Sequence, residues 1–216
     1  MEWYYYLVIV LVLLIIIGII ISFVLCHKHA EQNLKHKVWK KLYKLANNSD
    51  YYLLNQVNIE TEFKSNIHID HLLIGDKFVY VISSRYYEDN LYGKTYYDSK
   101  FNINTTDGTL IRSVTNPIIK NEKRSTILAK YLGCEKKYPM FVSIVVTNNV
   151  DVNVAEQNIA DYSYIIKCKD LSKTIKSIEK ESNLTPIDDQ SLQQVVNRLH
   201  TISVSLNKKE AEKENQ

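Results

Sequence analysis

The chain opens with an apolar stretch and continues with segments in which polar and apolar positions alternate. From Leu7 to Leu25 no residue is charged, and only Gly18 and Ser22 interrupt the large apolar side chains. A helix over this stretch spans about 28 Å, close to the roughly 30 Å hydrocarbon core of a bilayer. The aromatic residues at positions 3–6 suit the headgroup level at its outer end. The pattern predicts a transmembrane anchor over residues 1–27.

This segment does not have the pattern of a cleaved signal peptide. The only charge before the apolar stretch is Glu2, no Ala-x-Ala-like site follows the stretch, and Cys26 is preceded by Leu25 rather than by a small residue. We therefore expect the anchor to be retained, so that the rest of the chain is tethered to the cell membrane.

Basic residues indicate on which side of the membrane the rest of the chain lies. Between residues 28 and 44, six lysines are opposed only by Glu31. Because Lys and Arg close to a span stay in the cytoplasm, we expect the N-terminus outside the cell and the C-terminal domain in the cytoplasm. The same lysines suit either contact with anionic headgroups of the lipid bilayer or a solvated helix face, and the sequence leaves both open.

After the anchor the hydrophobic period becomes that of an amphipathic helix. Leu34, Val38, Leu42 and Leu45 recur at three- and four-residue spacing, which predicts a basic juxtamembrane helix within residues 28–50. Short β-branched and aromatic runs then predict strands. These runs are Leu53 to Ile59, Ile67 to Ile74, Phe78 to Ile82, Leu91 to Lys100, Thr109 to Val114, Met140 to Thr147 and Tyr164 to Lys167.

Three further helices are predicted between and after these strands. They run from Pro117 to Leu132 with Gly133 at the end, from Leu171 to Lys180, and from Pro186 to about Leu206. The whole is an α/β domain over residues 51–206, with a partly parallel mixed sheet flanked by helices. The charged segment at 207–216 has no large apolar residue, and we expect it to be disordered.

Composition narrows the range of functions without choosing one. The net charge of +3 is too small to indicate nucleic-acid binding by itself, although it is compatible with a local basic groove. The three cysteines have no metal-ligand spacing and are expected to be free thiols. Motifs of phosphate-binding loops, serine hydrolases and zinc proteases are absent from the sequence.

Several blocks resemble a known family in their order and spacing. The most specific is Ile69-Asp70-His71 before a hairpin, followed by residues 78–87, 91–93 and 116–121. Together they resemble the nuclease-related domain (NERD) family, a branch of the PD-(D/E)xK nuclease superfamily, over roughly residues 35 to 170. The resemblance implies a restriction-endonuclease-like core. In that core an Asp and a following Glu-x-Lys bind Mg²⁺ and activate the attacking water.

The chain departs from the family pattern at the expected catalytic positions. Asp70 matches the first carboxylate and is the candidate metal ligand. Ser83-Ser84-Arg85 stands where Glu-x-Lys is expected, and Lys120 replaces a glutamine that follows Asn-Pro-x-x. A serine supplies no carboxylate, and the high pKa of arginine makes it a poor general base. The resemblance therefore implies a degenerate site at Asp70, Ser83, Arg85 and Lys120.

Other carboxylates are candidates for the missing ligand. Glu60, Glu62, Glu88 and Asp89 lie near the predicted strands in sequence, although they suit exposed turns equally well. His71 is expected to be a packed or hydrogen-bonded histidine rather than a ligand.

Three hypotheses about function follow. The first is a single-pass membrane protein whose cytoplasmic NERD-like domain has lost its nuclease centre and binds DNA, RNA or a protein partner. The second is an active, divergent nuclease that uses Mg²⁺. The third is a membrane-proximal scaffold without a nucleic-acid role. No small-molecule cofactor is evident under any of them.

Overall fold

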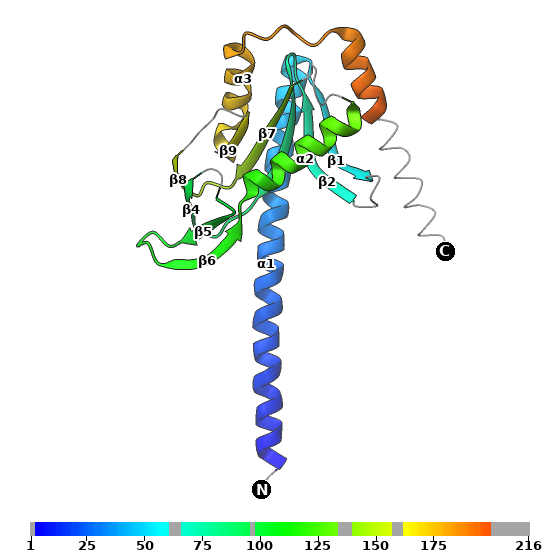
Figure 1. Cartoon of the computed structure of the whole chain (residues 1–216). Coiled ribbons are helices and arrows are strands. Elements are labelled where there is room, and N and C mark those ends of the chain that lie inside the picture. The colour runs from blue at the N-terminus through cyan, green and yellow to red at the C-terminus, as the bar shows by residue number, and fades with distance from the viewer. Residues whose placement is uncertain (1–2, 61–65, 96–97, 134–139, 157–161, 200–216) are drawn as a thin grey trace, which may run out of the picture.

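A computed structural model describes residues 3–60, 66–95, 98–133, 140–156 and 162–199 (Figure 1). These residues form one long N-terminal helix and an α/β domain with two sheets. The predicted fold class, a mixed sheet flanked by helices and preceded by an apolar helix, is confirmed. The predicted disordered tail at 207–216 lies outside the described residues.

The helix α1 runs without a break from Trp3 to Ser49 and has two parts with different surroundings. Its first part stands out from the domain, with the side chains of residues 3–26 exposed (Figure 1). By length and composition, this part is able to cross a membrane. Its second part packs on the domain through Leu34, Val38 and Leu42, which are buried as the amphipathic pattern predicts. The candidate membrane span is therefore continuous with a helix of the domain core.

The main sheet has the strand order β1-β2-β3-β7-β9. The strands β1 (Tyr52–Glu60), β2 (Asn66–Ile74) and β3 (Phe78–Arg85) are antiparallel, and β7 (Met140–Thr147) and β9 (Ser163–Lys167) extend the sheet in parallel. The nearly unbroken apolar sequences of β3 and β7 are explained by their central position, where both faces are buried.

Helices cover both faces of the main sheet. On one face, α1 and α3 (Leu171–Glu181), which follows a 3₁₀ turn at Cys168–Asp170, pack against Tyr80 and Ile82. On the other face, α2 (Pro117–Leu132) and a helix over residues 189–199 pack against the alternate positions of β3. Each helix buries one apolar stripe, so the sheet is enclosed in a three-layer domain.

The ends of α2 follow the sequence signals. The side chain of Asn116 accepts a hydrogen bond of 2.9 Å from the Ile118 backbone N–H, and Pro117 occupies the first turn. Gly133 ends the helix with φ at 71°, a left-handed conformation that favours glycine.

A second sheet was only partly predicted. It contains β4 (Asn90–Thr95), β5 (Lys100–Asn104), β6 (Leu110–Thr115) and β8 (Val152–Glu156), in the order β6-β5-β4-β8. The prediction of one strand from Leu91 to Lys100 is wrong, because β4 ends at Thr95 and Lys100 starts β5. Both β5 and β8 are short and rich in asparagine and charged residues, which weakens the strand pattern.

Candidate functional site

The site around Asp70 forms where two strands of the main sheet separate. The pairing of β2 with β3 extends only from the pair Ile74–Val79 to the pair His71–Ile82. At the next position the Asp70 side chain takes over as the partner of β3, since its Oδ2 accepts a hydrogen bond of 2.9 Å from the Ser84 backbone N–H. The carboxylate is 2% exposed. It therefore has a structural role as a hydrogen-bond acceptor, in addition to carrying a charge.

Basic side chains surround this carboxylate. Lys35 Nζ lies 3.2 Å from Asp70 Oδ1, and Arg85 Nη1 lies 3.8 Å from Oδ2. His68 Nε2 lies 3.4 Å from Oδ1. Burial alone would raise the pKa of Asp70, but the Ser84 N–H and the charges of Lys35 and Arg85 outweigh it and lower the pKa below its ordinary value. Asp70 is thus ionised at neutral pH and neutralised by its neighbours.

A second carboxylate reaches the same cluster from α1. Glu31 Oε1 lies 3.6 Å from Lys35 Nζ and 3.4 Å from Arg85 Nη1, so both cations contact Glu31 and Asp70. From the sequence, Glu31 and Lys35 indicated only the topology of the chain. Their four-residue spacing places them on one face of the helix, and this spacing in the sequence could have predicted the ion pair.

The residues predicted for the site are only partly brought together. Arg85 comes within ion-pair distance of Asp70, and Ser83, two residues earlier on β3, is buried. Lys120 is exposed on α2. One turn later, Arg124 is half-buried and interacts electrostatically with Arg85 and Asp70. Burial and the charge of Arg85 lower the pKa of Arg124, and Asp70 opposes this. The cation of α2 that reaches the cluster is therefore Arg124.

The carboxylates that were candidates for the missing ligand interact, where the structure describes them, with groups outside the Asp70 cluster. Glu88 accepts hydrogen bonds of 2.8 and 3.0 Å from Arg112, and Asp89 accepts one of 2.8 Å from the Asn90 backbone N–H. Glu60 is the last residue of β1, and Glu62 lies outside the described residues. The carboxylate that shares partners with Asp70 is Glu31.

His71 has the packing role expected for it. It is 2% exposed, and its Nδ1 lies 2.7 Å from Asn55 Oδ1. Burial, together with the charges of Lys35 and His68, lowers the pKa of His71 to about 4, and Asp70 opposes this shift. The side chain is therefore neutral at physiological pH.

The cluster does not fit a Mg²⁺ site. Mg²⁺ requires several oxygen ligands in octahedral geometry, whereas both oxygens of Asp70 already contact cations or a peptide N–H. Among the described residues, no three His, Cys, Asp or Glu side chains gather as a metal site. Cys26 and Cys168 are free thiols, and Cys134 lies outside the described residues. The arrangement suits an anionic ligand better than a metal ion.

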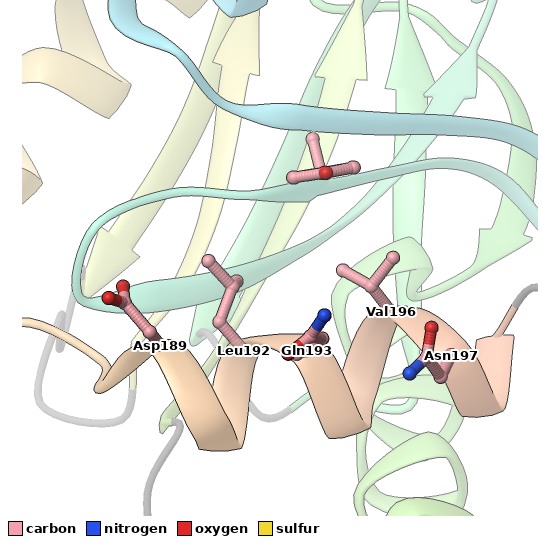
Figure 2. Close-up of a pocket in the computed structure, with 6 residues that line it drawn as sticks. Asp189, Leu192, Gln193, Val196 and Asn197 are labelled. Carbon is pink, nitrogen blue, oxygen red and sulfur yellow. The ribbon is translucent and has the colours of Figure 1, made fainter.

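Two surface pockets lie elsewhere in the domain. One of about 360 Å³ lies between Tyr52 of β1 and the helix over residues 189–199, with Leu192 and Val196 on its wall (Figure 2). Tyr52 pairs with Ile74, the last residue of β2, four residues along that strand from Asp70. The other, of about 390 Å³, lies on the second sheet beside Tyr92 and Lys100. Neither is lined by a residue of the Asp70 cluster.

Comparison with known proteins identifies one family. A family model described as NERD, nuclease-related domain, matches residues 28–148. No curated protein and no solved structure matches the chain. The matched segment begins directly after the apolar part of α1 and includes every residue of the cluster from Glu31 to Arg124.

Proposed function

Because the chain belongs to the nuclease-related domain (NERD) family, we propose that it is a membrane-anchored, catalytically degenerate nuclease-like domain. In this proposal the domain binds the phosphate backbone of a nucleic acid without cleaving it. The observation that carries the proposal is the neutralised Asp70. A carboxylate that binds a catalytic metal needs free oxygen lone pairs, and those of Asp70 are engaged by Lys35, Arg85 and the Ser84 N–H.

The charge and exposure of the cluster support phosphate binding. Lys35, Arg85 and Arg124 carry three fixed positive charges against the two carboxylates of Asp70 and Glu31. The side chains of Lys35, Arg85 and His68 are 29%, 25% and 40% exposed, whereas Asp70 is buried beneath them. A ligand from solvent therefore meets the cations first, and a guanidinium suits phosphate oxygens through paired hydrogen bonds.

The proposal also places the domain on the cytoplasmic face of the cell membrane, with the N-terminus outside. The lysines that follow the apolar part of α1 support this orientation, since such residues stay in the cytoplasm. Because α1 is continuous, Lys35 lies ten residues beyond Leu25, which is about 15 Å along the helix axis. The cluster is therefore close to the membrane surface.

A cleavage assay tests the loss of catalysis. The full chain in detergent micelles is incubated with plasmid, single-stranded DNA and RNA in Mg²⁺ or Mn²⁺, and we expect no cleavage above that of D70A. The double variant S83E/R85K restores the family's residue types. Cleavage by this variant, with none by the unaltered chain, would show that the loss of these residues explains the loss of catalysis. Cleavage by the unaltered chain that disappears in D70A would instead establish the active, divergent nuclease.

A matched pair of variants on α2 tests the binding function. Arg124→Ala removes a cation that interacts with Asp70 and Arg85, and Lys120→Ala removes an exposed cation one turn away. We expect R124A to weaken binding of a labelled oligonucleotide about fivefold and to reduce the salt slope by about 1. K120A should stay close to the unaltered chain. Equal effects of the two variants, or binding that does not respond to salt, would favour a protein partner or a scaffold.

A further inference from the structure

The hairpin of β5 and β6 lies at the end of the domain from which the apolar part of α1 emerges (Figure 1). Two apolar side chains of β6, Leu110 and Ile111, are exposed there. From its position and exposure we infer that this hairpin rests on the lipid surface beside α1, with Leu110 and Ile111 at the headgroup boundary. The inference rests on the membrane anchoring in the proposed function, and it adds a second point at which the domain meets the bilayer.

The exposure of β6 is the first observation. Leu110 and Ile111 are consecutive and 56% and 46% exposed, and within β6 only Val114 is half-buried. Ile111 is the extra residue of a β-bulge, because Ile103 pairs with Arg112 and Asn104 pairs with Leu110, so β6 is locally kinked where these two apolar side chains are exposed. β6 is also an edge strand of the second sheet. Exposed apolar pairs on an edge strand need an explanation, because in water they favour aggregation.

The height of the hairpin along α1 is the second observation. The ring of Tyr86, just after β3, lies 5.5 Å from the ring of His27. Glu88, two residues later, holds Arg112 of β6 through hydrogen bonds of 2.8 and 3.0 Å. His27 is only two residues beyond Leu25, about 3 Å along the helix axis. These contacts fix β6 near the level at which the apolar part of α1 ends.

The bilayer is the occupant that this geometry favours. If the apolar part of α1 spans the membrane, then the headgroups begin at the level of Leu25 and extend along the surface on which β6 lies. Leucine and isoleucine gain free energy at that boundary, and Lys28, three residues beyond Leu25 on α1, suits anionic headgroups. The exposed Asp107 at the hairpin turn limits the depth, so the contact is shallow.

The experiment measures which positions contact lipid. Three single-cysteine variants of the full chain, Ile111→Cys, Asn47→Cys and Leu14→Cys, are made after the native cysteines are replaced by alanine. Each is labelled with a fluorophore and reconstituted in vesicles of phosphatidylcholine and phosphatidylglycerol, with and without brominated lipid. Asn47 is the matched control, because it is exposed on the same helix about 33 Å beyond Leu25.

We expect brominated lipid to quench the labels at positions 14 and 111 and to leave the label at position 47 unchanged. Quenching at 14 but not at 111 would overturn the hairpin contact while the anchor stands. A disulfide between two copies of unlabelled I111C, with no lipid quenching of the labelled protein, would overturn the lipid contact and show that a second copy covers the edge strand. Absence of quenching at 14 would remove the anchor itself, and the hairpin contact with it.

Discussion

Replacing Asp70 with alanine is expected to lower the free energy of unfolding by about 2–3 kcal/mol at neutral pH. The change removes the acceptor of the Ser84 N–H and leaves the positive charges of Lys35 and Arg85 without their buried partner. The cost is below that of a fully buried ion pair, because both cations are partly exposed. Urea unfolding of the full chain in micelles, followed by tryptophan fluorescence, measures it.

Asp70→Asn separates the structural role of this residue from its charge. The amide keeps the volume and an oxygen that can accept the Ser84 N–H, so D70N should retain more stability than D70A. Because it removes one negative charge from beneath the cations, D70N should also bind the oligonucleotide more tightly than the unaltered chain does. If D70N binds the oligonucleotide more tightly and is less stable, then the cluster has a binding role in addition to its structural one. Weaker binding by D70N would contradict phosphate recognition at this place.

The pKa of Asp70 determines the pH below which its charge no longer stabilises the folded state. A carboxyl whose pKa is lowered on folding stabilises the folded state above its unfolded pKa, near 3.8. The stabilisation is then lost as the pH falls through the lower folded value. The difference in stability between the unaltered chain and D70N should therefore be constant from pH 5 to pH 8.

Local sequence predicted the main sheet well and the second sheet poorly, for physical reasons. Continuous apolar runs such as Met140–Thr147 specify buried central strands, so β7 was predicted with the bounds that it has. In β5 only Phe101 and Ile103 are buried, and the polar residues between them resemble a loop. These strands depend on pairing with segments far away in sequence, as β4 pairs with β8. Single-segment patterns do not carry that information.

The candidate site shows the same division between local and distant information. The resemblance to the family led to Asp70 and Arg85, which lie on neighbouring strands and come within ion-pair distance. Glu31, Lys35 and Arg124 were missed, because they lie on α1 and α2, which precede and follow β2 and β3 in the sequence. The four-residue spacing of Glu31 and Lys35 indicated a pair within the helix, but it did not indicate that Lys35 also neutralises Asp70. His68 had a usable signal, since it lies two residues from Asp70 on the same strand face.

The continuity of α1 links the site to the candidate membrane span. Glu31 and Lys35 belong to the helix that carries the apolar span, and Arg85 is followed directly by Tyr86, which contacts His27. Because this helix is also packed in the domain core through Leu34, Val38 and Leu42, the cluster and the sheet should follow a change in the tilt of the apolar part as one body. In a domain joined to its anchor by a flexible linker, this coupling would not exist.

The stability of the domain should fall as the pH is lowered from 6.5 to 4, and His71 should account for about 3 kcal/mol of that loss. The pKa of buried His71 is lowered to about 4 in the folded state, while the unfolded chain takes up the proton near 6.5. The stabilisation is fully present above the unfolded pKa and is lost as the pH falls toward the folded pKa. Urea unfolding at intervals between pH 4 and pH 8 measures the curve.

His71→Leu is the matched variant for this prediction. Leucine has a similar volume, fits among the buried apolar residues of β2, and leaves the exposed Asn55 to hydrogen-bond with water. At pH 7.5 we expect H71L to differ from the unaltered chain by less than about 1 kcal/mol. At pH 4.5 the variant should be the more stable of the two, because it has no proton to exclude. Parallel curves for the two proteins would show that His71 is not the group whose protonation unfolds the domain.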